Sequence, residues 1–261
     1  MNRSWRTLLS SLTLIWLPVV LILAWWIGSA TSTSVFFPPL SKILERLREQ
    51  WLFDHTVSDL LPSLTNLAVG YFLAAVVGVF VGAMLWRFRG MSDAAHPVVY
   101  FLYVLPAPAL LPLFMALFGL GATMKISIIF LSCVWPVLLN TLDGMRSTDS
   151  IKIDVARVLN LNTWATLRRV VLPAAAPQIA AGLRTSLAIG IVLMVVSEMT
   201  AATSGIGYFI LNAQQTFATV DMWTGILVLA IVGSLLNLLF IRLERWVLRW
   251  HYQARAISDA H

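Results

Sequence analysis

Few residues of this chain have the types and spacing that catalysis needs. Ser197 and Glu198 are adjacent, but neighbouring residues on a helix point about 100 degrees apart, so they do not form a nucleophile and base pair. The histidines lie outside the centres of the apolar stretches, at His55, His96, His251 and His261. Neither an H-E-x-x-H metal pattern nor a G-x-x-x-x-G-K-[ST] phosphate loop occurs. We therefore expect no catalytic residue, no metal site and no cofactor in this chain.

The segment that stands out is instead a polar one, residues 154–177, between two apolar stretches. Residues 151–159 and 163–171 are each long enough for about two helical turns. Asn160 suits the left-handed conformation that ends a helix, and Asn162 or Thr163 suits the start of the next. We expect Pro173 and Pro177 to stop the second helix. An ordinary connecting loop is the open alternative.

The composition places this loop beside a membrane. The chain has 261 residues, of which 59% are hydrophobic and 11% charged, whereas a soluble domain has about 25% charged residues. The single cysteine, Cys133, lies in an apolar run and excludes a disulfide framework. The chain is thus predicted to be an all-α integral membrane protein without a cleavable signal peptide.

Uncharged stretches of roughly 20 residues locate the spans. We expect one membrane domain, residues 1–261, with six transmembrane helices at about residues 8–27, 60–86, 98–118, 124–141, 178–203 and 222–241. Prolines predict a broken third span, and residues 41–51 predict an amphipathic helix at the interface, with a solvated linker as the alternative. Small residues recur every four positions in the second span, which predicts close helix packing, at Gly70, Ala74, Gly78 and Gly82.

Basic residues predict the orientation. With the N-terminus inside, 14 of the 18 lysines and arginines lie in the cytosol, and only Lys42, Arg46, Arg48 and Lys125 lie outside. We therefore expect both termini and residues 146–177, which contain the polar loop, to be cytosolic. This topology explains the net charge of +6 without a nucleic-acid partner.

The polar loop also carries a resemblance. Asp154, Val155, Ala156, Asn160 and the closing residues 170–173 (VVLP) resemble the E-A-A, three residues, G, nine residues, I-x-L-P signature of permease subunits of binding-protein-dependent ABC importers. Asp for Glu, Val155 for Ala and Asn160 for Gly are departures, and Asn is the residue after Gly that best tolerates a left-handed turn. Further segments, such as residues 105–121 and 205–207, resemble the taurine, alkanesulfonate and nitrate branch.

The resemblance implies a type I importer fold in a bacterial inner membrane, two permease copies around a shared path, a pair of separate ATPase subunits that bind ATP and magnesium, and an extracytoplasmic binding protein. It implies that the loop docks on the ATPase as a coupling helix. Its contact candidates are Asp154, Ala156, Asn160, Leu161 and Trp164.

The path through the membrane is predicted from buried polar residues. Only 13 residues separate Arg184 from Glu198, about 20 Å of helix, so at least one of these charges lies within the membrane. The short side chain of Glu198 favours a site inside the bundle. Glu198, Ser197 and Asn140 are the candidates for the path, and hydrogen bonding between helices is the alternative reading.

Two other classes stay open at this point: a secondary transporter driven by an ion gradient, for which internal repeats are expected, and a membrane scaffold. The solute is also open among sulfonates, nitrate, aromatic acids and pyrimidine-like vitamin precursors. A sulfonate-like organic anion is the solute that the resemblance favours.

Overall fold

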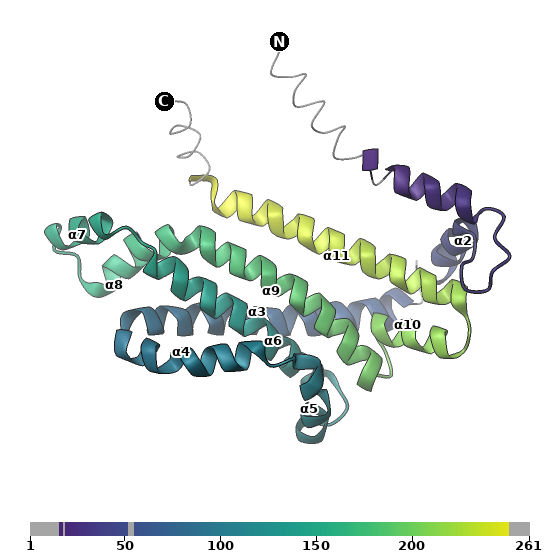
Figure 1. Ribbon diagram of the computed structural model, residues 1–261, viewed down its shortest axis with the longest axis horizontal. Helices are drawn as coiled ribbons and strands as arrows, with labels where there is room; N and C mark the ends of the chain where they lie inside the picture. The colour runs from purple at the N-terminus through teal and green to yellow at the C-terminus, as the bar shows by residue number, and fades with distance from the viewer. Residues whose placement is uncertain (1–15, 18, 52–54, 251–261) are drawn as a thin grey trace, which may run out of the picture.

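The computed structural model describes residues 16–17, 19–51 and 55–250, which form helices joined by short turns (Figure 1). An apolar helix, Val19–Ser29, comes first. The following elements are α2 (Leu40–Trp51), η1 (Thr56–Leu60), α3 (Leu61–Arg87), α4 (Arg89–Val104), η2 (Ala107–Leu110), α5 (Leu111–Phe118), α6 (Ala122–Arg146), α7 (Ser150–Val158), α8 (Thr163–Thr166), η3 (Leu167–Val171), α9 (Leu172–Ala201), α10 (Ile206–Gln215) and α11 (Thr219–Val247).

The described residues contain four helices long and apolar enough to cross a membrane, or five if a bent pair counts as one span. The four are Thr56–Arg87, Ala122–Arg146, Thr163–Thr200 and Thr219–Val247. The expectation of an all-helical membrane protein is confirmed. Part of the expected first span, residues 8–15 and 18, lies outside the described residues, and its remainder falls on the shorter helix Val19–Ser29.

Helix α6 lies at the centre and packs against α3 on one side and α9 on the other. The small-residue face of α3 makes the first contact, as its four-residue spacing predicts. A Cβ atom added to Gly78 would lie 2.8 Å from Val137 Cβ, and one added to Gly82 would lie 2.8 Å from Thr141 Cβ. Because these glycines have no side chain, the two helix backbones approach closely along their length.

The expected break in the third span is confirmed. Gly90–Val104 and Ala107–Phe118 meet at an angle of 84°. Leu105, which precedes a proline, takes the extended ψ of 125° that the proline ring favours. Pro108 and Pro112 each lie at the first or second position of a new helix, where a missing N–H costs nothing. The prolines therefore divide one apolar stretch into two helices.

The two ends of the bundle differ (Figure 1). Helices α7 and α8 lie at one end, whereas α2 and α10 lie at the other, from which α11 runs back toward the end with α7 and α8. The predicted amphipathic helix is α2, and it packs against α11 with Ile43 fully buried. Arg46 Nε donates to Asp221 Oδ1 at 2.8 Å, and this bond, with a second to Glu49, raises the pKa of Arg46.

Candidate functional site

The polar loop begins with a capped helix, α7. The side chain of Asp149 accepts a hydrogen bond from the backbone N–H of Ile151 at 2.9 Å, so one of the unpaired donors of the first turn has a partner. On the surface of α7, Arg157 Nη1 donates to Asp154 Oδ1 at 2.7 Å, one helical turn apart. The side chain of Asp149 therefore caps the start of α7, and an ion pair on its surface joins two of its turns.

A Schellman turn ends α7 at Asn160. Asn160 has a φ of 51°, the left-handed conformation expected from the sequence. The N–H of Leu161 donates to the carbonyl of Ala156 at 3.0 Å, and the N–H of Asn160 donates to the carbonyl of Arg157 at 2.9 Å. These two bonds define the motif, and they fix the direction in which the chain leaves the helix.

The next helix starts two residues later with a second cap. Asn162 Oδ1 accepts the N–H of Ala165 at 2.8 Å, as predicted for this residue. The expectation that Pro173 and Pro177 stop this helix is wrong, because it continues through a π turn, η3, into α9 as one unit, Thr163–Thr200. Pro173 lies in the first turn of α9, directly after the wider turn, where a proline is tolerated. The loop is thus joined to a span by unbroken helix.

The loop presents most of its predicted contact residues to solvent. Asp154 and Asn160 are exposed, Trp164 is 67% exposed and Leu161 is half-buried. Ala156 differs, because it is only 1% exposed and packs inside this chain. Its small size allows α7 to lie against the rest of the loop.

Sequence reasoning missed an apolar face on the same helix. Ile151, Val155, Val158 and Leu159 are 68%, 53%, 81% and 65% exposed. Their spacing of four, three and one residues places them along one side of α7. A cluster of exposed apolar side chains on a polar loop is typical of a surface that another protein covers. The helical spacing is the signal that would have found it.

The three residues predicted for the path lie within the helix packing. Asn140 donates from Nδ2 to the carbonyl of Pro136 and accepts from Gln178 Nε2, each at 2.8 Å, which joins α6 to α9. Ser197 is fully buried and donates to the carbonyl of Met194 at 2.9 Å. Glu198 is 1% exposed. The bond between Asn140 and Gln178 fits the alternative of hydrogen bonding between helices, whereas the bond of Ser197 lies within α9. A role of the three residues in the path stays a prediction.

Glu198 belongs to a polar network at the end opposite the loop. Three side chains accept the first backbone N–H groups around the start of α10: Asp59 Oδ1 accepts from Gly205 at 2.8 Å, Ser63 Oγ from Ile206 at 3.0 Å and Glu198 Oε2 from Gly207 at 3.0 Å. Carboxylates are favoured there by the positive end of the helix dipole. Residues of α9 and of the α3 region thereby hold α10 in place.

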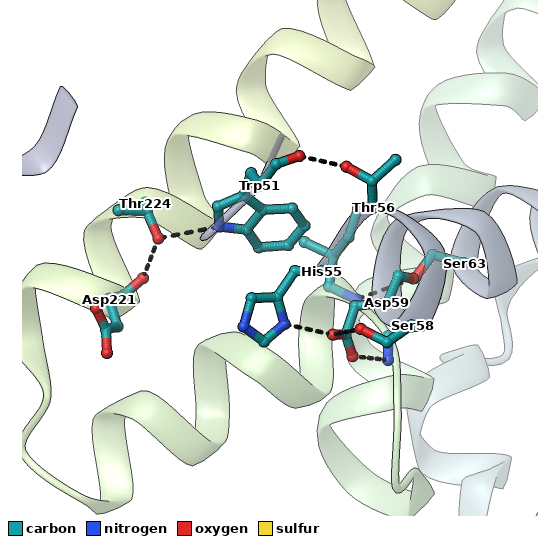
Figure 2. A network of polar contacts seen from close by, with 10 residues as sticks. Trp51, His55, Thr56, Ser58, Asp59, Ser63, Asp221 and Thr224 are labelled. Atoms are coloured by element: carbon teal, nitrogen blue, oxygen red, sulfur yellow. Dashed lines mark hydrogen bonds and ion pairs between the residues drawn. The ribbon is translucent and has the colours of Figure 1, made fainter. Parts of the chain in front are cut away.

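Figure 2 shows how this network extends to α2 and α11. His55 Nδ1 lies 2.7 Å from Asp59 Oδ2, and its ring contacts those of Trp51 and Phe209 in a tilted arrangement. Trp51 Nε1 donates to Thr224 Oγ1 at 3.1 Å, which links α2 to α11. No group of three histidine, cysteine, aspartate or glutamate side chains suited to a metal ion occurs among the described residues. The hydrogen bonds of the network join α2 to α11 and the α3 region to the start of α10.

Comparison with known proteins identifies the family. Residues 62–250 match the model of the family described as "Binding-protein-dependent transport system inner membrane component". One relative is the protein of Bacillus subtilis named "Putative aliphatic sulfonates transport permease protein SsuC". It is 33% identical over 236 residues, which cover 90% of this chain and 86% of that protein. The taurine transport system permease TauC of Escherichia coli is 33% identical over 239 residues, with 89% and 87% covered.

Solved structures agree on the fold. A chain of the MetNI methionine ABC transporter in an inward-facing conformation superimposes with a TM-score of 0.65 at 19% identity, covering 76% of this chain and 98% of that one.

A third sequence relative, the bicarbonate transport permease CmpB of Synechococcus elongatus, is 31% identical, and the match covers 95% of this chain. Membership of this family decides against the ion-gradient transporter and the scaffold. The chain belongs to the family of binding-protein-dependent transport system inner membrane components, and is the multi-pass permease subunit of an ABC importer.

Proposed function

We propose that two copies of this permease form the path for a small organic anion of the sulfonate type, delivered by an extracytoplasmic binding protein. The names of its relatives support this substrate class, because they refer to aliphatic sulfonates, taurine, bicarbonate and nitrate. All four carry or are small oxyanions. In this proposal, ATP and magnesium bind to a pair of separate ATPase subunits.

We further propose that each copy has six spans with both termini and residues 146–177 in the cytosol. The four long helices, the bent pair and the apolar helix Val19–Ser29 supply six apolar segments. Their alternating directions bring the loop helices α7 and α8 and the final residues of α11 to the same end of the bundle (Figure 1). The concentration of basic residues at this end supports a cytosolic position.

The geometry of the loop carries the proposal. Capped α7, the Schellman turn at Asn160 and the unbroken helix from Thr163 to Thr200 form a rigid connection between a cytosolic surface and a membrane span. A push on the exposed apolar face of α7 can then move α9 as a lever, because no flexible joint absorbs it. We propose that this face and Asp154, Asn160, Leu161 and Trp164 dock on the ATPase, with Ala156 supporting them from beneath.

Asn160 provides the test. In the left-handed conformation a β-branched residue is disfavoured by about 1–2 kcal/mol, whereas glycine adopts this conformation without such a penalty. A penalty of about 1.4 kcal/mol lowers the population of the left-handed turn by about tenfold. We therefore expect Asn160→Val to lower solute uptake per ATP hydrolysed by about tenfold. Asn160→Gly is the matched control, and we expect it to keep native coupling.

The measurement uses the permease reconstituted in liposomes with its ATPase and binding protein. Uptake of a radiolabelled sulfonate and release of phosphate are followed in the same preparation. If Asn160→Val couples as well as Asn160→Gly, the loop is not the lever that we propose. If no sulfonate is taken up by the native transporter while ATP is hydrolysed, the substrate class is wrong and the coupling assignment is tested with another anion.

A further inference from the structure

A cavity of about 660 Å³ lies at the end of the bundle opposite α7 and α8. It is bordered by the start of α3, the turn between α5 and α6, and the segment that follows α9. Its wall combines apolar side chains such as Met115 and Leu120 with the hydroxyl groups of Thr65 and Thr203. Lys125 is the one charged side chain among the described residues that line it. A small molecule with a polar head and a short apolar body fits such a wall.

The amide of Asn66 is the first sign of a ligand. Asn66 is only 6% exposed and lines the cavity, yet its side chain makes no hydrogen bond to any residue that the structure describes. It stands four residues before Gly70 on the face of α3 that packs against α6. A mostly buried amide has few partners within reach, and each hydrogen bond that it lacks costs free energy. A molecule in the cavity, water or a ligand, can supply these bonds.

The ammonium group of Lys125 is the second sign. Lys125 is 6% exposed, and the bond that its Nζ donates to the carbonyl of Ser204 is long, at 3.4 Å. An ammonium group has three donors, so two are left for a ligand. Lys125 also lies in the first turns of α6, where the positive end of the helix dipole disfavours a cation. An anion beside Lys125 relieves both costs.

The backbone at the start of α6 adds donors to the same place. Gly121 precedes the helix and provides no side-chain cap, and both Gly121 and Ala122 line the cavity. The first N–H groups of a helix have no partner within it and point outward from its start. An ammonium group, an amide and a helix N-terminus thus converge on one cavity.

Nearby carboxylates moderate the charge without entering the cavity. Glu198 interacts electrostatically with Lys125, but its Oε2 accepts the N–H of Gly207. Asp59 accepts the N–H of Gly205. Neither carboxylate lines the cavity. We expect an affinity weak enough for release, as a transport pathway requires.

We propose that this cavity is a binding site for a small oxyanion with a short apolar body, in which Lys125, Asn66 and the start of α6 hold the anionic head. The substrate class rests on the proposed function, and a sulfonate is its best representative. The apolar wall formed by residues such as Met115 and Leu120 accommodates the body. Glu198, Ser197 and Asn140, the polar residues singled out by the sequence, do not line this cavity, although Glu198 interacts electrostatically with Lys125.

The charge preference of the cavity is tested first, with Thr203→Cys as the reporter. Thr203 is exposed and lines the cavity, whereas the native Cys133 is buried and serves as the blank. The assembled transporter, in nanodiscs of zwitterionic lipid, is treated with a thiosulfonate reagent that carries either a sulfonate or a trimethylammonium group. We expect the ratio of the two rates to fall by about tenfold when Lys125 is replaced by methionine, the size of one unit charge at short range in a partly aqueous site.

Two control variants make this result specific. Lys125→Arg keeps the charge and should keep the ratio. Lys42→Met removes an exposed lysine of α2, outside the cavity, and should also keep it. An unchanged ratio in Lys125→Met would overturn the proposal.

Protection by a free ligand is tested second. We expect millimolar propanesulfonate to slow modification of the Thr203→Cys reporter at least threefold, and to leave a reporter at the exposed position Val35 unaffected. Asn66→Leu, which removes the amide and leaves the charge of Lys125 in place, should abolish this protection while the rate ratio persists. Protection that survives Asn66→Leu, or that phosphatidylglycerol gives and propanesulfonate does not, would overturn the assignment.

These measurements need neither the binding protein nor transport. A native transporter that takes up no sulfonate therefore contradicts the proposed function, while the labelling results still decide whether the cavity holds an oxyanion.

Discussion

Replacing Gly78 with alanine measures how much the close contact between α3 and α6 contributes to this fold. The added Cβ would lie 2.8 Å from both Val137 Cβ and Cγ1, and 3.1 Å from the carbonyl oxygen of Val134. Carbon atoms prefer a separation of about 3.5–4.0 Å, so the helices must separate by several tenths of an ångström. Neither Val137 Cβ nor the backbone carbonyl can move aside by a rotamer change.

The cost follows from this geometry. Overpacking of a well-packed contact lowers the free energy of unfolding by about 1–3 kcal/mol. Replacing a glycine with alanine within a helix raises it by up to about 1 kcal/mol. Gly233→Ala in α11 isolates the gain, because nothing lies within 4 Å of its added Cβ. We expect Gly78→Ala to be less stable than Gly233→Ala by about 1–3 kcal/mol, or about 2–12 °C in unfolding temperature at 2–4 °C per kcal/mol.

Thermal unfolding of the purified permease, followed by size-exclusion chromatography after heating, measures this difference. Val137→Ala in the Gly78→Ala background removes Cγ1 but leaves Cβ at 2.8 Å, so we expect only partial rescue. If Gly78→Ala unfolds at the same temperature as Gly233→Ala, the helices tolerate a side chain at this contact and the packing argument fails.

Two further predictions concern the caps. Asp59→Ala removes the acceptor for the N–H of Gly205, and we expect a loss of about 0.5–2 kcal/mol and faster amide exchange at the start of α10; Asp59→Asn, which keeps an acceptor oxygen, should restore protection, and equal exchange in all three proteins would contradict the role. Asn162→Ala removes the acceptor for the N–H of Ala165. We expect about 1 kcal/mol of local destabilisation and faster exchange in α8, whereas an unchanged rate would mean that another group caps this helix.

Local features of the loop were predictable because they depend on neighbouring residues. The left-handed conformation of Asn160 follows from the tolerance of asparagine for positive φ, and the cap by Asn162 follows from a side chain that bonds three residues further on. The helix through Pro173 was not predictable in this way, since a π turn in the preceding residues accommodates the proline. A proline in isolation indicates a stop, and only the surrounding turn shows whether the helix continues.

The sequence by itself determined the class of protein, the turn and cap of the polar loop, and the packing face of α3, since composition, capping residues and four-residue spacing are properties of contiguous segments. Only the tertiary structure decided how distant polar residues combine. Asp59 and Ser63 bind Gly205 and Ile206 across 146 and 143 positions. Asn66 and the start of α6 line the same cavity only because two spans pack side by side. Helix packing sets which polar groups find partners and which face a cavity, and no local pattern encodes that choice.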